Sequence, residues 1–288
     1  MTLGTERDYS KKTMALITGQ QLSRYFDQFN TIDVTFSKGV VEALGLKTDQ
    51  NFLKCLGNQW PCIIYSASMK GARVVANLTQ DFFNKIREAN NIVSLRFAFN
   101  QPDKADPLAF FIPAKVTGYN PYNKEKPDLM FITLEYTQRP ADDLIAILGQ
   151  LLETNVNSKK RREERIDVTD EVQRSLGLRT KSIFLYIEGI PRKSLLRDIS
   201  FSGAKCITSG IAKFLENKNV SVSLEFDDKK TPMQIPGKII RYENVQGRKD
   251  IVALAILFEE SKVPMDYKMR INEYLRIPKK HLAKDPGE

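Results

Sequence analysis

Two short segments carry side chains that could bind an anion. RREER, residues 161–165, places Arg161 and Arg165 four positions apart. A guanidinium is a flat fork of donors that pairs in bidentate fashion with phosphate or with two acceptors on a ring edge. DISFSG, residues 198–203, contains Asp198, Ser200 and Gly203. Because a carboxylate accepts N–H donors, the two segments together predict a binding site.

Each segment also has an ordinary interpretation. Taken alone, KKRREER is more typical of a solvated linker or of an exposed helix face with i,i+4 ion pairs. Asp198 and Ser200 are compatible with a simple turn, and Arg241 with an exposed strand position. The binding hypothesis therefore depends on further features of the chain.

An internal repeat is the first such feature. IDVT at 32–35 recurs 134 positions later at 166–169, and LGLKT at 44–48 recurs 132 positions later as LGLRT. The second offset then pairs Ser68 with Ser200 and Gly71 with Gly203, and IPAKVTGY at 112–119 matches IPGKIIRY at 235–242. We interpret the chain as a duplication, with two residues gained or lost between the first two landmarks.

The elements that must position these residues follow from the apolar pattern. Short alternating runs such as VSVSLEF and IVALAILF are broken by turn clusters such as NVQGRKD, and each copy ends in an amphipathic helical pattern. The sequence predicts a mainly β protein of two tandem small antiparallel β-barrels, each followed by an amphipathic α-helix and joined by a helical, basic linker. The expected parts are a tail at 1–14, a first domain with its closing helix at 15–157, a basic linker at 158–165, a second domain at 166–277 and a tail at 278–288.

The two copies diverge at charged positions. With IDVT as the anchor, Asp27 aligns with Arg161 and Thr31 with Arg165, and at the SxxGA turn, where the offset is 132, Ser66 aligns with Asp198. Arg241 lies opposite Gly118 in the matching late segment. Residues 1–158 carry 17 Lys+Arg and 16 Asp+Glu, whereas residues 159–288 carry 27 and 19. This asymmetry favours a phosphate-bearing partner for the second copy.

The two motifs in this order resemble the RxxxR and [DN]xSxxG motifs of PilZ domains, the bacterial receptors for cyclic di-GMP. GKIIRYE and ALAILF resemble the later strands of that barrel, so the likeness covers most of residues 159–275, although Ala255 stands where a glycine is expected. Residues 15–157 resemble a degenerate PilZ-like domain, identified only through the internal repeat.

This resemblance implies a ligand and its contacts. Cyclic di-GMP would be bound as a ligand, without a metal. Arginine would pair with phosphate or the guanine O6/N7 edge, and Asp198 would accept the guanine N1–H and N2–H donors. The implied site residues are Arg161, Arg162, Arg165, Asp198, Ser200 and Gly203, with Lys160, Ser202 and Arg241 at its margin. Lys160 precedes the arginine pair, where the family tunes stoichiometry, so one ligand molecule and an intercalated dimer both remain open.

Catalysis and membrane insertion find little support in the sequence. The one histidine, His281, lies in a charged terminal segment, and there is no GxxxxGK[ST] phosphate loop. The polar start MTLGTERDYSKK and the lack of any apolar run near 20 residues predict a cytoplasmic protein with no membrane span. Three cysteines without metal-site spacing are expected to be reduced and mostly buried.

Two functions remain as hypotheses. The first is a non-enzymatic cyclic di-GMP receptor that signals by interdomain rearrangement to an unidentified downstream protein, with bacterial motility regulation as an implied output. The alternative is a basic RNA- or DNA-binding protein, itself open to regulation by cyclic di-GMP, which the sequence pI near 9.3 favours.

Overall fold

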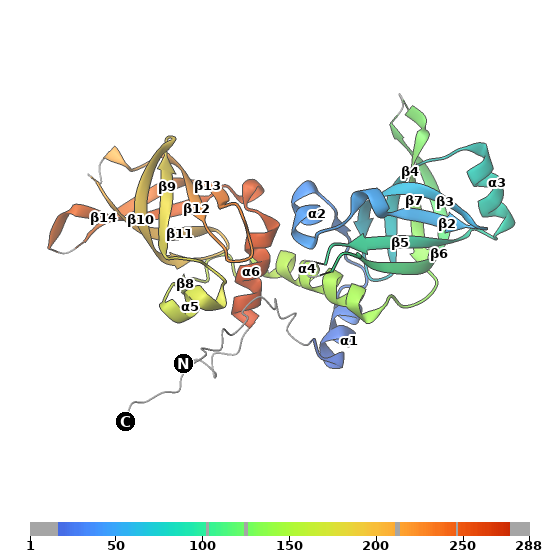
Figure 1. Ribbon diagram of the computed structural model, residues 1–288, viewed down its shortest axis with the longest axis horizontal. Coiled ribbons are helices and arrows are strands. Elements are labelled where there is room, and N and C mark those ends of the chain that lie inside the picture. Colours follow the sequence, from blue (N-terminus) through green and yellow to red (C-terminus); the bar gives the residue numbers. More distant parts are fainter. Residues whose placement is uncertain (1–16, 102–103, 124–125, 211–213, 246, 277–288) are drawn as a thin grey trace, which may run out of the picture. The chain divides into compact units, whose positions relative to one another are not determined.

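The chain folds into two compact units, and the division between them falls between Glu153 and Thr154. Figure 1 shows the computed structural model, which describes residues 17–276 except 102–103, 124–125, 211–213 and 246. The predicted tails at 1–14 and 278–288, and with them His281, lie outside the described residues. Within the described part of the chain, no helix is both long and apolar enough to cross a membrane.

The first unit contains a closed antiparallel barrel. Its strands are β1 (Val34–Thr35), β2 (Phe52–Cys55), β3 (Asn58–Ala67), β4 (Gly71–Asn77), β5 (Ile92–Phe99), β6 (Leu108–Asn123) and β7 (Lys126–Tyr136). The order is β1-β3-β2-β5-β6-β7-β4, and a further pairing of β3 with β4 closes the ring. Its helices are α1 (Gly19–Gln28), α2 (Lys38–Leu44), the 3-10 turn η1 (Thr48–Gln50), α3 (Gln80–Glu88) and the start of α4 (Asp142–Lys160).

The second unit repeats this barrel strand for strand. Its strands are β8 (Ile166–Asp167), β9 (Ser182–Ile187), β10 (Ile190–Ile199), β11 (Gly203–Ser209), β12 (Asn219–Leu224), β13 (Met233–Val245) and β14 (Arg248–Phe258). The order β11-β14-β13-β12-β9-β10-β8, closed by β11 with β10, has the same topology as the first. Within the described residues its helices are the end of α4, α5 (Asp170–Ser175), η3 (Glu260–Lys262) and α6 (Met265–Arg276). The predicted fold class, two tandem barrels each followed by a helix, is confirmed.

Local sequence explains these elements. Along β9, the side chains of Ile183, Leu185 and Ile187 are buried in the barrel while their neighbours face outward, which is the period-two pattern of a half-buried strand. Glu188 and Gly189, both with positive φ, connect β9 to β10 in a two-residue loop that suits a tight hairpin. Thr169 caps α5 by accepting the Val172 amide at 3.2 Å.

The strand register corrects one feature of the predicted repeat. In β1, Val34 pairs with Ala67, and in β8, Ile166 pairs with Ile199. Val34 is therefore equivalent to Ile166, and the offset is already 132 here instead of 134. The hydrogen bonds that follow each strand agree, because the Phe36 amide donates to the Tyr65 carbonyl as the Val168 amide does to Arg197. The IDVT match is a coincidence shifted by two residues, and no residue was gained or lost between this strand and the LGL[KR]T segment.

This correction changes which residues of the two units are equivalent. The pairs of Asp27 with Arg161 and of Thr31 with Arg165 are wrong. Asp33 is the true equivalent of Arg165, and Phe29 is that of Arg161. The amides of Phe29 and Arg161 both close the last turn of a helix, onto Tyr25 at 3.0 Å and Asn157 at 2.8 Å. The first unit still lacks both arginines.

Helix α4 is continuous, but its two parts correspond to two different helices of the repeated unit. It begins after Pro140, as α6 begins after Pro264, so its first part is the closing helix of the first barrel. Its last part, residues 151–160, is equivalent to α1 at the 132-residue offset and leads into β8 as α1 leads into β1. Residues 154–160 belong to the second unit, where the Asn157 side-chain amide donates to the Asn272 side-chain oxygen at 2.8 Å.

All three cysteines are free and buried, as predicted. Burial raises the pKa of the Cys62 thiol to about 12. Because the thiolate is the reactive form, the native cysteines should react slowly with alkylating labels at neutral pH.

Candidate functional site

The turn between β10 and β11 is held by one buried hydroxyl. The Ser200 side-chain oxygen accepts the amides of Gly203 at 3.1 Å and Ser202 at 3.3 Å, and the Tyr267 hydroxyl donates to the Ser200 carbonyl at 2.7 Å. In the first unit, Ser68 accepts the Gly71 amide in the same way at 3.2 Å. Both units bond the serine hydroxyl to the glycine amide in this way, so the serine serves first to shape the turn.

Gly203 is required by strand packing. A Cβ at this position would lie 2.2 Å from the carbonyl oxygen of Ile256 on β14, and its equivalent Gly71 would meet the Leu134 carbonyl at 2.4 Å. No side chain fits at that distance without separating the strands. Ser200 and Gly203 therefore belong to the architecture that positions the neighbouring Asp198.

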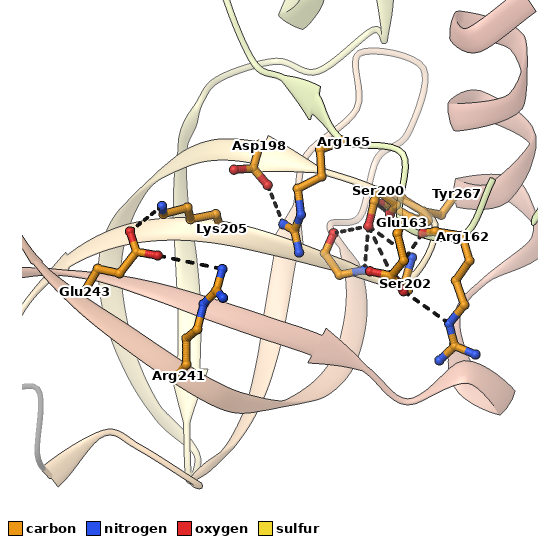
Figure 2. Close-up of polar contacts among 11 residues, drawn as sticks. Arg162, Glu163, Arg165, Asp198, Ser200, Ser202, Lys205, Arg241, Glu243 and Tyr267 are labelled. Atoms are coloured by element: carbon orange, nitrogen blue, oxygen red, sulfur yellow. Dashed lines mark hydrogen bonds and ion pairs between the residues drawn. The ribbon is translucent and has the colours of Figure 1, made fainter.

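Asp198 lies on the outer face of the barrel beside the arginine segment, as Figure 2 shows. A β-bulge between Leu196 and Asp198 turns its side chain outward, and its lateral neighbours are Asp167 on β8 and Lys205 on β11. The Arg165 guanidinium donates to its carboxylate at 2.5 Å. The Asp198 side chain is only 12% exposed, whereas that of Arg165 is 38% exposed, so solvent or a ligand reaches the pair from the arginine side.

The other two arginines of the motif make separate contacts. Both lie in the turn that follows α4. Arg161 donates to the Leu275 carbonyl near the end of α6 at 3.2 Å, and Arg162 pairs with Glu260 at 2.9 Å. The structure thus brings Arg165, but not Arg161, to Asp198. Lys160 ends α4 and is exposed.

Ser202 joins the arginine turn to the serine turn. Its hydroxyl lies within donating distance of the Arg162 carbonyl, 3.0 Å, and of the Glu163 carboxylate, 3.1 Å. The two motifs, 40 positions apart at this contact, are therefore attached directly to each other in the folded chain.

Two residues that sequence reasoning missed extend the charged face. Lys205 is the lateral neighbour of Asp198, and Glu243 on β13 accepts a hydrogen bond from the Lys205 ammonium at 2.6 Å. Arg241, the marginal site residue on β13, lies 3.7 Å from the other Glu243 oxygen. Hydrogen bonding to Lys205 first, and the charge of Arg241 in addition, lower the pKa of Glu243. Lys205 and Glu243 could be assigned to this face only from the strand register, which the sequence did not reveal.

The equivalent face of the first unit has different chemistry. Ser66 occupies the position of Asp198, and Gly118 that of Arg241, each after the same β-bulge as its equivalent. Arg73, equivalent to Lys205, lies over the Phe131 ring with its guanidinium carbon 5.1 Å from the ring centroid. The Arg–Asp pair and the Lys–Glu–Arg group occur in the second unit alone among these equivalent positions.

Such a face can bind a phosphate-bearing ligand with N–H donors. Guanidinium and ammonium groups complement phosphate, and the largely buried Asp198 carboxylate complements donors on a base edge. No cluster of three or more histidine, cysteine or acidic side chains suited to a metal ion occurs within the described residues.

Comparisons with known proteins identify the class. Residues 20–155 match the PilZN3 domain, and residues 159–276 match the PilZ domain. The chain therefore belongs to the PilZ family, as a tandem of a PilZN3 domain and a PilZ domain, which confirms the family predicted from the motifs and the repeat.

A curated relative supports the same assignment. The chain is 47% identical over 275 residues to a protein of Treponema denticola named cyclic di-GMP binding protein, covering 96% of this chain and 88% of the relative. Among solved structures, it resembles Borreliella burgdorferi PlzA in complex with c-di-GMP, with 22% identity, a TM-score of 0.41 and coverage of 88% and 98%. Escherichia coli YcgR in complex with c-di-GMP gives 10% identity, a TM-score of 0.29 and coverage of 92% and 93%.

Proposed function

We propose that this protein is a non-enzymatic receptor for cyclic di-GMP and that the ligand binds on the outer face of the second barrel. The observation that carries the proposal is the Arg165–Asp198 pair, 2.5 Å apart on the charged face of the PilZ domain and absent from the equivalent face of the first unit. The name of the 47% identical relative supports the same ligand.

Each group of the pair has a role toward a guanine nucleotide. Arg165, with Arg161 and Arg162 from the same turn, binds the phosphates or the O6/N7 edge of guanine. Asp198 accepts the guanine N1–H and N2–H donors, which adenine does not present in that arrangement. Ser200, Ser202 and Gly203 act by holding the turn that presents Asp198. Lys160, adjacent to the arginine turn, is placed to affect whether one ligand molecule or an intercalated dimer binds.

Arg161 must exchange partners for this role. Its guanidinium is bonded to the Leu275 carbonyl and lies near Glu164, 3.8 Å away. Both contacts involve a half-exposed side chain and are individually weak in water. A doubly charged dinucleotide offers stronger, bidentate partners, so ligand binding draws Arg161 from α6 toward Asp198.

Replacing Asp198 with asparagine tests the assignment. We expect Asp198→Asn to weaken cyclic di-GMP binding by at least about tenfold. The asparagine side chain has an NH₂ group where aspartate has a second acceptor oxygen, so it cannot accept both the N1–H and the N2–H of guanine. The wild-type protein should bind cyclic di-AMP far more weakly than cyclic di-GMP, because an unpaired buried carboxylate disfavours the wrong base. Calorimetric titrations of both ligands measure these differences.

A charge-matched control separates base recognition from net charge. Asp250→Asn removes the same charge from an exposed pair with Arg248 and should leave the affinity within about twofold. Equal affinity for the two dinucleotides, or full affinity in Asp198→Asn, would show that Asp198 does not recognise guanine.

Nucleic-acid binding is the second candidate function, favoured by the excess of basic residues after position 158. Affinity for duplex DNA falls with salt by a log–log slope of about −0.9 per phosphate contact. Binding in a shaped dinucleotide site depends less on salt. Titrations of cyclic di-GMP and of duplex DNA or RNA at two salt concentrations therefore distinguish the two ligands.

The signal is proposed to pass from the arginine turn to both units and on to a downstream protein. Helix α4 spans the boundary between the units and ends at Lys160, directly before Arg161. Movement of Arg161 away from Leu275 changes how the last turn of α4 is held. A protein of this kind would act in the cytoplasm, with motility control as one output.

Labels on the two units test this transmission. Fluorophores on cysteines introduced at the exposed strand positions Lys54 and Lys193 should change their energy-transfer efficiency when cyclic di-GMP saturates the protein. The native cysteines are buried and should not compete for the label. An unchanged distance distribution at saturation would contradict the rearrangement and leave signalling through a local surface.

A further inference from the structure

The outer face of the second barrel carries a row of charged side chains that continues beyond the two motifs. Strand pairing aligns Asp198 with Lys205, Lys205 with Ala255, and Ala255 with Arg241 across β10, β11, β14 and β13. Because directly paired residues on adjacent strands point to the same side of a sheet, these four side chains share one face. Figure 2 shows Lys205, Glu243 and Arg241 beside the Arg165–Asp198 pair.

Small side chains form the floor between the two cations. Ala255 lies between Lys205 and Arg241, and Ala253 lies one outward-facing step along β14, paired with Glu243. Neither alanine reaches above the strand surface. The surface of β14 between the two cations is therefore formed by small side chains.

The Glu243 carboxylate lies between these two cations. One oxygen lies 2.6 Å from the Lys205 ammonium, and the other lies 3.7 Å from the Arg241 guanidinium. A phosphate oxygen has the same preference for these two cations as a carboxylate oxygen. Glu243 therefore contacts the same two cations that a phosphate group of a ligand would contact.

The first unit lacks this arrangement. By strand register, Gly118 and Asn120 are equivalent to Arg241 and Glu243, and Phe131 replaces Ala253. The Arg73 guanidinium lies over the Phe131 ring. The Lys–Glu–Arg group is thus not needed to build the barrel, since the same fold forms without it.

We infer that Lys205 and Arg241 form a second phosphate-binding element of the dinucleotide site, and that Glu243 is an internal competitor that ligand phosphate displaces. The inference rests on the proposed function and adds to it a residue that sets affinity. Glu243 lowers the affinity because the ligand must break its contacts with both cations before binding them.

The test compares calorimetric affinities of full-length variants for cyclic di-GMP. Glu243→Gln should bind about fivefold more tightly than wild type, the effect of losing an exposed ion pair that competes with the ligand. Lys205→Ala should bind about tenfold more weakly. In the double variant Lys205→Ala/Glu243→Gln, the gain in affinity that Glu243→Gln gives should be smaller. The reason is that the Lys205 ammonium, which Glu243→Gln would free for the ligand, is absent.

Glu225→Gln is the matched control. Glu225 follows β12 in the same unit and pairs with Arg179 at 3.5 Å, so its substitution makes the same change in net charge away from the row. We expect its affinity to equal that of wild type. An affinity of Glu243→Gln equal to that of Glu225→Gln, or weaker than wild type, overturns the inference while the receptor function stands. Absence of binding by wild-type protein overturns both.

Discussion

Replacing Arg161 and Arg165 together with alanine should lower the affinity for cyclic di-GMP by about 10²–10⁴-fold. A hydrogen bond to a charged group contributes roughly 1.5–3 kcal/mol, and each arginine makes at least one such bond to phosphate or guanine in the proposed complex. Since the first unit has Phe29 and Asp33 at the equivalent positions, it offers no second site to compensate. Isothermal titration of the full-length variant measures the loss.

A control must account for two lost positive charges. Arg179→Ala/Arg248→Ala removes the same charge from exposed pairs with Glu225 and Asp250 and should retain near wild-type affinity. The loss of Arg165 also leaves the Asp198 carboxylate without its partner, at a cost of about 1–3 kcal/mol in stability. Thermal unfolding should therefore accompany each titration, at a temperature where the variant is folded. Retained affinity in a folded Arg161→Ala/Arg165→Ala protein would contradict the site.

Gly203→Ala should destabilise the second unit by about 3 kcal/mol, even though it adds a single methyl group. The new Cβ would lie 2.2 Å from the Ile256 carbonyl oxygen, a backbone atom that can move away only if β11 and β14 separate. For a unit of this size, such a change lowers the unfolding midpoint by roughly 10 °C. Calorimetric scanning of the full chain checks the shift.

The duplication supplies its own controls for this prediction. Gly71→Ala places a Cβ 2.4 Å from the Leu134 carbonyl and should lower the unfolding midpoint of the first unit by a similar amount. Gly39→Ala lies in α2 with nothing within 4 Å of the added atom, so it should be neutral or slightly stabilising. An unchanged midpoint in Gly203→Ala would mean that the strands separate there without cost.

Much of the fold was accessible from sequence because it depends on repeated local patterns. Alternating apolar residues predicted the strands, and the 132-residue offset from Leu44 through Ala72 predicted two barrels of one topology. The same offset matched Ser66 to Asp198, and the late-strand match paired Gly118 with Arg241, both of which the strand registers reproduce. These inferences hold because equivalent positions in a duplicated barrel meet the same packing constraints.

The repeat was misjudged where the elements are shortest. β1 and β8 contain two residues each, which is too short for an apolar pattern to fix the alignment. The four identical residues of IDVT therefore suggested the wrong offset. Backbone hydrogen bonds to β3 and β10 determine the register, and these bonds carry no side-chain signature. The serine and glycine of the turn, predicted as site residues, also have a structural role that the sequence alone did not separate out, since Ser200 and Gly203 make the same contacts within the fold as Ser68 and Gly71.

The sequence by itself determined the family, the duplicated barrel and the candidate pair of Arg165 with Asp198. Only the tertiary structure decided that Arg161 bonds to Leu275, that Ser202 joins the two motifs, and that Lys205 and Glu243 share the face with Arg241. Composition and periodicity act through neighbours along the chain, whereas the Lys205–Glu243, Ser202–Arg162 and Arg161–Leu275 contacts join residues 38 to 114 positions apart. Their formation depends on strand order, on the β-bulges and on side-chain direction, which exist only once the barrel has closed.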